Sequence, residues 1–268
     1  MSTLRSAKVN RLRSSTPSSA SSRSGQSPRI GASLRQRPWL ERAVRLVAKL
    51  ITLSFLLSFG WVVLLKYLPV SFTPLMISRK LEAMGEDQDS RLYKNWTPYE
   101  SISKEVALAV VASEDQAFPA HWGFDFDEIQ DAIKDNQHRK RPRGASTISQ
   151  QVAKNVFLWN GRSYLRKGLE VYFTFLIELI WGKERILEVY LNVAETGPLT
   201  FGVEAASRRY YGHSAQSLTR TEAARIAAVL PNPRLFSIKK PSAYTQKRTR
   251  QIARQMRYLG GRAYLKNL

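Results

Sequence analysis

The chain has 268 residues, a formal net charge of +21 and no cysteine. The lack of cysteine excludes disulfides and thiolate metal sites. The charge calls for an anionic partner, such as nucleic acid, an anionic membrane surface or a phosphorylated substrate.

The first part of the chain is basic and of low complexity. Residues 1–49 hold eleven Lys or Arg and one acid, Glu41. The first 35 residues are rich in Ser, Arg, Gly and Pro, and such a segment cannot bury enough apolar surface to offset its ordering entropy. We therefore predict a disordered basic cytoplasmic tail over residues 1–45.

An uncharged run of sixteen residues, Leu50 to Leu65, follows the tail. With its apolar flanks it predicts one transmembrane helix over residues 46–68, with Lys49 and Lys66 reaching the two interfaces. A buried core helix is the alternative, but the run is apolar on every face. A cleaved signal peptide is disfavoured because no small-x-small cleavage site follows in "KYLPVSFTPLM".

The bases before this run place the N-terminus in the cytoplasm and the rest of the chain outside, in the periplasm of a Gram-negative cell. We therefore expect a single-pass protein of the cell inner membrane. An outward-facing main domain makes nucleic acid an unlikely partner, so none is predicted, and anionic lipid accounts for the basic tail.

The remaining pattern is helical, and no stretch shows sustained period-two alternation. We predict a stalk over 69–95, a mainly α-helical domain over 96–240 and a basic amphipathic tail over 241–268 that lies on lipid or frays. The expected helices cover residues 101–118, 125–136, 147–158, 163–181, 182–194, 201–212 and 218–230. Thr147 is a predicted N-cap, Thr219 and Glu222 have capping-box spacing, and Gly182 is a predicted hinge.

Glu114 ends the first, nearly all-apolar helix of the domain. Apolar surroundings and a helix C-terminus both disfavour the charged form of a carboxylate, so its pKa should rise. A Glu of this kind serves as a general base or acid near neutral pH. A solvated helix end is the alternative, and this stretch alone does not decide between the two.

Small residues, Gly144 to Ser146, precede the helix that starts near Thr147, and Gln150 and Lys154 share a face of that helix with Thr147. Free backbone N–H groups at such a helix start bind anions, although small-residue loops before helices are common.

Arg162, Arg166 and Glu170 follow at four-residue steps, with Lys167 three before Glu170. An ordinary salt-bridged helix surface is the alternative interpretation of that spacing. Together, one candidate base and several cations suit sugar transfer from a diphosphate, whereas a hydrolase must protonate a poor leaving group.

At these residues the sequence resembles the peptidoglycan glycosyltransferases, glycosyltransferase family 51. The five matching stretches are "EDQAFPAHWGFD", "GASTISQQVAKN", "RKGLE", "KERILEVYLN" and "GVEAASRRYYG". In the last one Val203 and Tyr211 replace the usual Ile and Phe. The resemblance covers roughly residues 95 to 240 and implies a lysozyme-like fold.

The resemblance implies polymerisation of lipid II by inverting transfer from a polyprenyl-diphosphate-linked glycan, which gives β-1,4 links. It makes Glu114 the general base on the GlcNAc 4-hydroxyl and places Glu170 near the donor diphosphate, as the two catalytic residues. The substrate-binding residues that it implies are Asp115, Phe118, His121, Arg143, Gly144, Ser146, Thr147, Gln150, Gln151, Lys154, Asn155, Arg162, Arg166, Lys167, Lys183, Glu188, Tyr190 and Asn192. The resemblance implies that the last four also hold the cleft together.

No cofactor is expected to be required, although some members of that family use Mg or Mn at the diphosphate. The string from Ser101 to Lys104 is no transpeptidase signature, because no K-T-G or S-D-N follows it, so a single-domain enzyme is expected. The expected partners are lipid II, the polyprenyl-linked glycan, the bacterial inner membrane and proteins of cell-wall synthesis or division. Two alternatives remain: a lytic transglycosylase or lysozyme, which would shorten glycan, and a non-catalytic membrane scaffold, which would not need Glu114.

Overall fold

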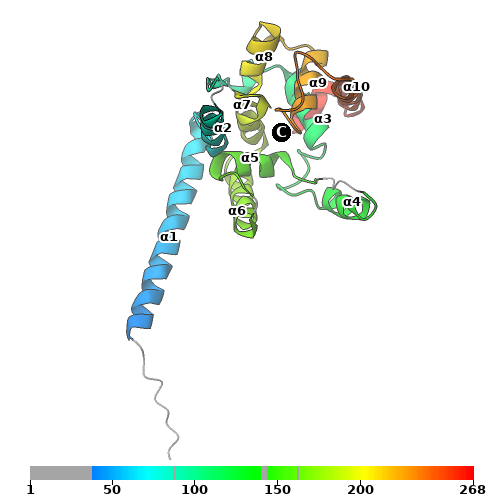
Figure 1. Cartoon of the computed structure of the whole chain (residues 1–268). Coiled ribbons are helices and arrows are strands. Elements are labelled where there is room, and N and C mark those ends of the chain that lie inside the picture. Colours follow the sequence, from blue (N-terminus) through cyan, green and yellow to red (C-terminus); the bar gives the residue numbers. More distant parts are fainter. Residues whose placement is uncertain (1–37, 87–88, 140–143, 162) are drawn as a thin grey trace, which may run out of the picture. The chain divides into compact units, whose positions relative to one another are not determined.

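The computed structural model describes residues 38–86, 89–139, 144–161 and 163–268, and it is mainly α-helical (Figure 1). The chain divides into two compact units, residues 1–48 and 49–268. Of the first unit only the start of helix α1 is described, and the predicted disorder of residues 1–37 lies outside the described residues. Residues 38–45, which we expected to be part of the disordered tail, are helical instead.

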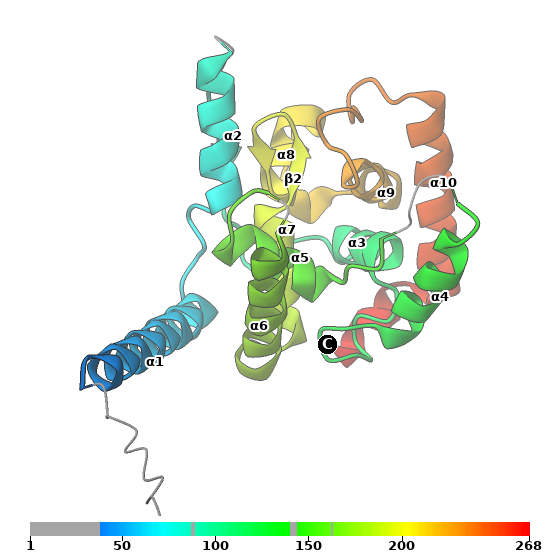
Figure 2. The same ribbon diagram turned by 60° about the horizontal axis from the view of Figure 1, so that its bottom comes forward.

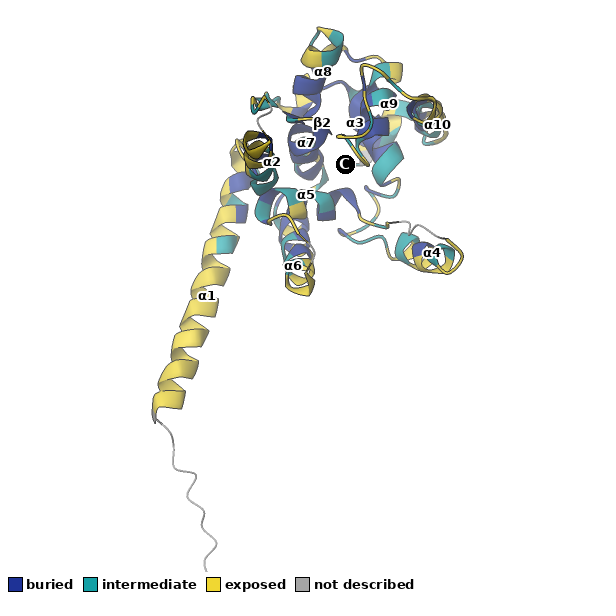
Figure 3. Cartoon of the chain, in the orientation of Figure 1, coloured by how far each residue is buried: buried dark blue, intermediate teal, exposed yellow. Residues whose placement is uncertain are grey.

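Helix α1 (Pro38–Tyr67) is the one described helix that is long and apolar enough to cross a membrane, over Trp39–Tyr67. Most of its side chains are exposed, as the yellow ribbon in Figure 3 shows. Its last turns belong to the second unit: the Trp181 indole Nε1 donates to the Val62 carbonyl (2.8 Å), and an Arg185 Nη2 donates to the Leu65 carbonyl (2.8 Å). The Leu65 carbonyl is one of the last four that an α-helix leaves without an intrahelical partner, so Arg185 satisfies it, and Trp181 adds a second contact one turn earlier.

The helices of the second unit follow the predicted pattern closely. They are α2 (Pro74–Gly85), α3 (Lys104–Glu114), α4 (Phe126–Asn136), α5 (Ile148–Phe157), α6 (Tyr164–Ile180), α7 (Lys183–Val193), α8 (Val203–Tyr211), α9 (Arg220–Val229) and α10 (Ala243–Tyr258). Short 3₁₀ helices cover Tyr99–Ser101, Ala215–Ser217 and Gly261–Asn267. The Thr147 and Thr219 caps are confirmed, each within a full capping box, and Gly182 separates α6 from α7 with a φ of 77°.

A small sheet was not predicted. Strands β1 (Tyr93–Lys94), β2 (Glu195–Gly197) and β3 (Thr200–Phe201) lie in the order β1-β3-β2, with β1 parallel and β2 antiparallel to β3. Strands of two or three residues are too short to show alternation, so the sequence pattern carried no signal for them.

Helix α3 is the centre of the core. Its residues from Val106 to Ala112 are all buried, as are most of α7 and α9 (Figure 3). Helices α9 and α10 pack against α3 on one side, and α5 packs against both α6 and α7 (Figure 2). The C-terminal end of α3 is thereby held between the two groups of helices.

The predicted boundaries of this domain were wrong at both ends. Residues 69–95, expected as a stalk, include α2, which buries Met76 and Ala83 against the domain, and β1, which joins the sheet. Residues 241–268, expected as a tail on lipid or frayed, form α10 and a final 3₁₀ helix, and Ile252 and Met256 are fully buried. Ile252 and Met256 lie four residues apart, which is helical spacing, but the many Lys and Arg residues around them indicated a surface tail instead.

Truncation of the buried side chain in α10 tests its place in the core. We expect Met256→Ala to lower the free energy of unfolding by about 2–5 kcal/mol, because it removes buried methylene groups and leaves a cavity. Denaturant titration of the solubilised protein, followed by circular dichroism, measures the loss. The matched control is Arg254→Ala on the exposed side of α10, which should change stability by less than about 0.5 kcal/mol. Equal effects of the two changes would contradict the packing of α10.

Candidate active site

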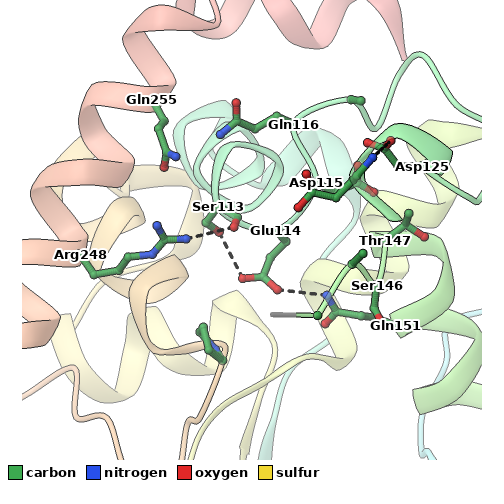
Figure 4. A pocket seen from close by; sticks show the side chains of 15 residues that line it. Ser113, Glu114, Asp115, Gln116, Asp125, Ser146, Thr147, Gln151, Arg248 and Gln255 are labelled. Atoms are coloured by element: carbon green, nitrogen blue, oxygen red, sulfur yellow. Dashed lines mark hydrogen bonds between the residues drawn. The ribbon is translucent and has the colours of Figure 1, made fainter. Parts of the chain in front are cut away.

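A cavity of about 870 Å³ lies where the end of α3, the start of α4, the start of α5 and helix α10 meet (Figure 4). Its lining is unusually polar, with four carboxylic acids, three glutamines and one arginine among the described residues. These are Glu114, Asp115, Asp125, Glu128, Gln116, Gln151, Gln255 and Arg248. Gly144 and Ser146, both predicted to bind substrate, also line it.

The Glu114 carboxylate points into this cavity and receives a hydrogen bond from the Gln151 amide Nε2 (3.0 Å, Figure 4). Burial raises the pKa of Glu114 above its ordinary value, and the nearby Asp115 adds to this. The Gln151 hydrogen bond, the Arg248 charge and the Ser113 hydroxyl oppose the shift without cancelling it. The predicted rise of this pKa is therefore found, and its main cause is the predicted one, burial.

Gln151 is itself oriented by a buried tyrosine. The Tyr190 hydroxyl donates to the Gln151 Oε1 (3.2 Å), so the amide presents its NH₂ group to Glu114. Burial, together with the charges of Glu114 and Asp115, raises the pKa of Tyr190 well above its ordinary value, which keeps the hydroxyl a donor. Tyr190 thus acts on the site through Gln151.

Several residues predicted to bind substrate hold the walls of the cavity together. The buried Asp115 carboxylate accepts from the Ile148 backbone N–H (2.9 Å) and contacts the His121 Nε2 (2.9 Å). The Thr147 hydroxyl donates to the Gly123 carbonyl (2.6 Å). Gly123 has a φ of +77°, and a Cβ there would lie 2.7 Å from the Thr174 methyl group, so the motif requires glycine at this position.

Other predicted ligands are also engaged within the protein. Phe118 is fully buried, and Gln150 is buried in the α5 capping box. The Asn192 amide bridges both the N–H and the carbonyl of Thr97. Glu188 pairs with Arg185 (2.6 Å). These contacts give the four residues a structural role, and the sequence motifs alone did not separate that role from ligand binding.

A second group of charges lies along α5 and α6, away from the lining of the cavity. The buried Glu170 carboxylate pairs with Arg166 (3.2 Å) and Lys167 (2.6 Å), as the spacing predicted. Burial lowers the pKa of Lys154 on α5; Glu170 opposes this, whereas Arg166 and Lys167 add to it. Lys183 pairs with Glu178 (2.7 Å) and lies over the Phe118 ring. Asn155 is half-buried on α5, and Arg143 and Arg162 lie outside the described residues.

The sequence motifs missed the contribution of α10. Arg248 donates an Nη2 hydrogen bond to the Ser113 carbonyl (3.2 Å), next to Glu114, and Gln255 lines the cavity one heptad further along (Figure 4). The Gln255 Oε1 is buried without a hydrogen-bond partner among the described residues. Their seven-residue spacing beside buried Ile252 and Met256 was the available signal, but it lay in a segment assigned to a tail.

A family model described as transglycosylase matches residues 80–257, two thirds of the chain. The chain belongs to the transglycosylase family. The limits of the matched region agree with the structure, in which the domain starts within α2 and includes α10. They differ from our predicted limits of residues 96 and 240. The catalytic-motif residues and α10 thus lie in a single family domain.

Relatives named biosynthetic peptidoglycan transglycosylase are similar over most of their length. The protein of Pseudomonas fluorescens (strain SBW25) is 52% identical over 207 residues, which is 77% of this chain and 86% of the relative. That of Pasteurella multocida (strain Pm70) is 50% identical over 217 residues, covering 81% and 88%. That of Chromohalobacter salexigens is 48% identical over 233 residues, covering 87% and 99%.

The Gln151 hydrogen bond gives a pH test of this transglycosylase site. A general base works only when deprotonated, so activity should fall as the pH drops through the raised pKa of Glu114. Gln151→Met removes a donor that favours the carboxylate, so we expect the acid limb of the kcat/KM profile to move to higher pH. The control is Gln116→Met, which lines the same cavity but donates to the Ala112 carbonyl instead. An unmoved acid limb in Gln151→Met would contradict this assignment.

Proposed function

We propose that this protein is a peptidoglycan glycosyltransferase that polymerises lipid II into β-1,4-linked glycan, with a polyprenyl-diphosphate-linked glycan as the donor. The observation that carries the proposal is the half-buried Glu114 carboxylate, which has a raised pKa and an oriented amide partner inside a large polar cavity. Membership of the transglycosylase family and the names of the relatives support it.

In this proposal Glu114 removes the proton from the acceptor's sugar hydroxyl while that oxygen attacks the anomeric carbon of the donor. The new C–O bond forms on the face opposite the departing diphosphate, so the configuration inverts. The amide, hydroxyl and carboxylate groups around Glu114 are of the kind that bind sugar hydroxyls, and Gly144 and Ser146 add a backbone wall. Asp115 and His121 position this base rather than exchange protons with substrate.

The charges on α5 and α6 are assigned to the leaving group. Arg166, Lys167 and Lys154 would neutralise the donor diphosphate as negative charge develops on it. Glu170 keeps the first two cations in place, since one of its oxygens pairs with each. This makes Glu170 an organiser of the diphosphate site rather than a second acid.

A divalent cation is proposed as an aid and not a requirement. Both Glu170 oxygens are already paired, so a Mg or Mn ion at this place would be held mainly by the diphosphate oxygens. Among the described residues no group of three metal-ligating side chains occurs. Chelation should therefore slow polymerisation without abolishing it.

The proposed location is the bacterial inner membrane, with α1 as a single anchor, the N-terminus in the cytoplasm and the domain on the outer side. The apolar span and the eleven bases in the first 49 residues support this orientation. Proteins of cell-wall synthesis or division are the proposed protein partners. No nucleic-acid partner is proposed.

Loss of the base tests the function directly. We expect Glu114→Gln to reduce polymerisation of labelled lipid II by the solubilised protein about 10²–10⁴-fold, because the hydroxyl then lacks a general base. Gel separation of the glycan products measures this. The matched control is Glu100→Gln on an exposed position of the first 3₁₀ helix, which should polymerise like wild type.

Either of two results would contradict the proposal: glycan synthesis by folded Glu114→Gln at the wild-type rate, or shortening of purified sacculi by the wild-type protein. The first would show that a group other than Glu114 is the base, and the second would favour a lytic enzyme. A wild-type protein that makes no glycan would favour the scaffold role. Circular dichroism of the variant separates loss of chemistry from loss of fold.

The cation group should affect donor binding. Lys167→Gln removes one of the charges assigned to the donor diphosphate while Arg166 still neutralises Glu170, so we expect KM for the polyprenyl-diphosphate-linked glycan donor to rise about tenfold with a smaller change in kcat. Initial rates at varied concentration of that donor, with lipid II held constant, measure both constants. Lys104→Gln, a charge loss at the start of α3, is the control, and an unchanged KM in Lys167→Gln would remove this residue from the site.

A further inference from the structure

A second cavity, of about 240 Å³, lies between α2, strand β1, the turn joining β2 to β3, and α8. None of the residues assigned to catalysis lines it. Its described lining holds four arginines and four carboxylic acids: Arg79, Arg91, Arg209, Arg234, Glu82, Glu86, Asp89 and Glu195. Some of these groups pair with one another: Arg79 with Glu82 (2.9 Å) and Glu195 (3.1 Å), and Arg234 with Glu82 (3.4 Å). The preference for a ligand that carries both signs therefore depends on Arg91, Arg209 and the second oxygen of Glu195.

Two of the arginines form one end of the cavity. The guanidinium groups of Arg91 and Arg209 lie 5.3 Å and 4.0 Å from the centre of the Tyr93 ring. Arg209 is further fixed by hydrogen bonds to the Pro198 carbonyl (3.0 Å) and the Thr200 hydroxyl (2.6 Å). Within the part of the chain that the structure describes, neither arginine forms an ion pair. Preoriented guanidinium groups of this kind bind carboxylates.

Glu195 supplies the opposite charge. Its side chain is only 6% exposed, and its Oε2 accepts from the Arg79 Nε (3.1 Å). Its other carboxylate oxygen has no partner among the described residues. Burial raises the pKa of Glu195, and Glu82 adds to this, whereas Arg79 and Arg234 oppose the shift without cancelling it. The ionised form would therefore still gain from a further cation. A ligand ammonium group at this oxygen would provide that cation.

The turn that borders the cavity is held in an uncommon conformation. Leu199 has a φ of 51°, and its carbonyl accepts from the Tyr93 backbone N–H (2.8 Å). Non-glycine residues in this region cost free energy and are retained where the surroundings determine them. The turn therefore fixes the position of Tyr93 relative to the Pro198 carbonyl and the Thr200 hydroxyl, the two groups that accept hydrogen bonds from Arg209.

We propose that this second cavity binds a free amino-acid group, with an ammonium and a carboxylate on one carbon, at the end of a side chain of the peptide that the glycan carries. The carboxylate lies against Arg91 and Arg209, and the ammonium lies against Glu195. The volume is below the roughly 300–1,000 Å³ of sites for whole drug-sized ligands, which fits the end of a chain. The identity of the ligand rests on the proposed function, because lipid II and its polymer both carry such peptides.

Calorimetric titration of the full-length solubilised protein tests this. The probe is the tripeptide L-Ala-γ-D-Glu-meso-diaminopimelate, whose side chain ends in a free amino-acid group. The matched peptide with L-Lys in the last position keeps the ammonium but lacks that carboxylate. We expect the first peptide to bind and the second to bind about tenfold more weakly, since one charge-assisted contact is lost.

Variants locate the binding. Arg91→Gln should weaken binding of the diaminopimelate peptide about tenfold, and the fold should survive because the Arg91 side chain makes no ion pair among the described residues. The control is Arg254→Gln on the exposed side of α10, and this variant should bind the peptide like wild type. No binding, equal affinity for the two peptides, or wild-type affinity in Arg91→Gln would each overturn the inference.

The same preparations are assayed for lipid II polymerisation, which separates this inference from the proposed function. Peptide binding without polymerisation would refute the proposed function and leave the amino-acid site standing. Polymerisation without peptide binding would refute the amino-acid site alone.

Discussion

The buried Asp115 carboxylate connects the end of α3, the turn that contains His121, and the start of α5. One of its oxygens accepts the Ile148 backbone N–H, and both lie within 3.1 Å of the His121 Nε2. Charge-assisted hydrogen bonds of this kind contribute about 1.5–3 kcal/mol each, and an unpaired carboxylate at this depth would be costly. The geometry of the large cavity depends on this connection, because it fixes where α3 ends.

Glu114 precedes Asp115 directly, so the same connection determines where the candidate base lies. Its carboxylate meets an amide from α5 and the field of an arginine from α10, and its burial is only partly compensated. Glu170 is also buried, but each of its carboxylate oxygens pairs with a cation, Arg166 on one and Lys167 on the other. Two glutamates in one domain thus have different electrostatic environments, which matches the separate tasks of accepting a proton and organising cations.

Helix α1, which is long and apolar enough to span a membrane, is physically continuous with this domain. Val62 and Leu65 of α1 are buried in the same core as α3 and α7, and Trp181 and Arg185 cap carbonyls near the end of α1. Both donors lie at the junction of α6 and α7, close in sequence to Lys183 and about three to four helical turns beyond Glu170. The end of α1 and the cation group therefore share structural support through α6.

Local sequence patterns were sufficient for most of the helices, for the Thr147 and Thr219 caps, for the hinge at Gly182 and for the Arg166–Lys167–Glu170 group. All of these depend on residues within a few turns of one another, where helix geometry alone determines which side chains meet. The motifs also identified the family, and they singled out Glu114, whose pKa the structure raises. They implied that Asn192 and Glu188 hold the cleft together but did not show which groups these residues or Gln150 contact, because a motif gives residue types and not contacts.

Long-range contacts were decided only by the tertiary structure. Arg248 reaches the Ser113 carbonyl across 135 residues of sequence, and α2 and α10 join the core from segments whose charges indicated a stalk and a tail. The second cavity likewise combines residues of α2, β1, β2 and α8, and no one of these elements shows the cavity alone. The physical reason is that side-chain spacing along a helix is set by local backbone geometry, whereas contacts between distant segments arise when apolar surfaces are buried together.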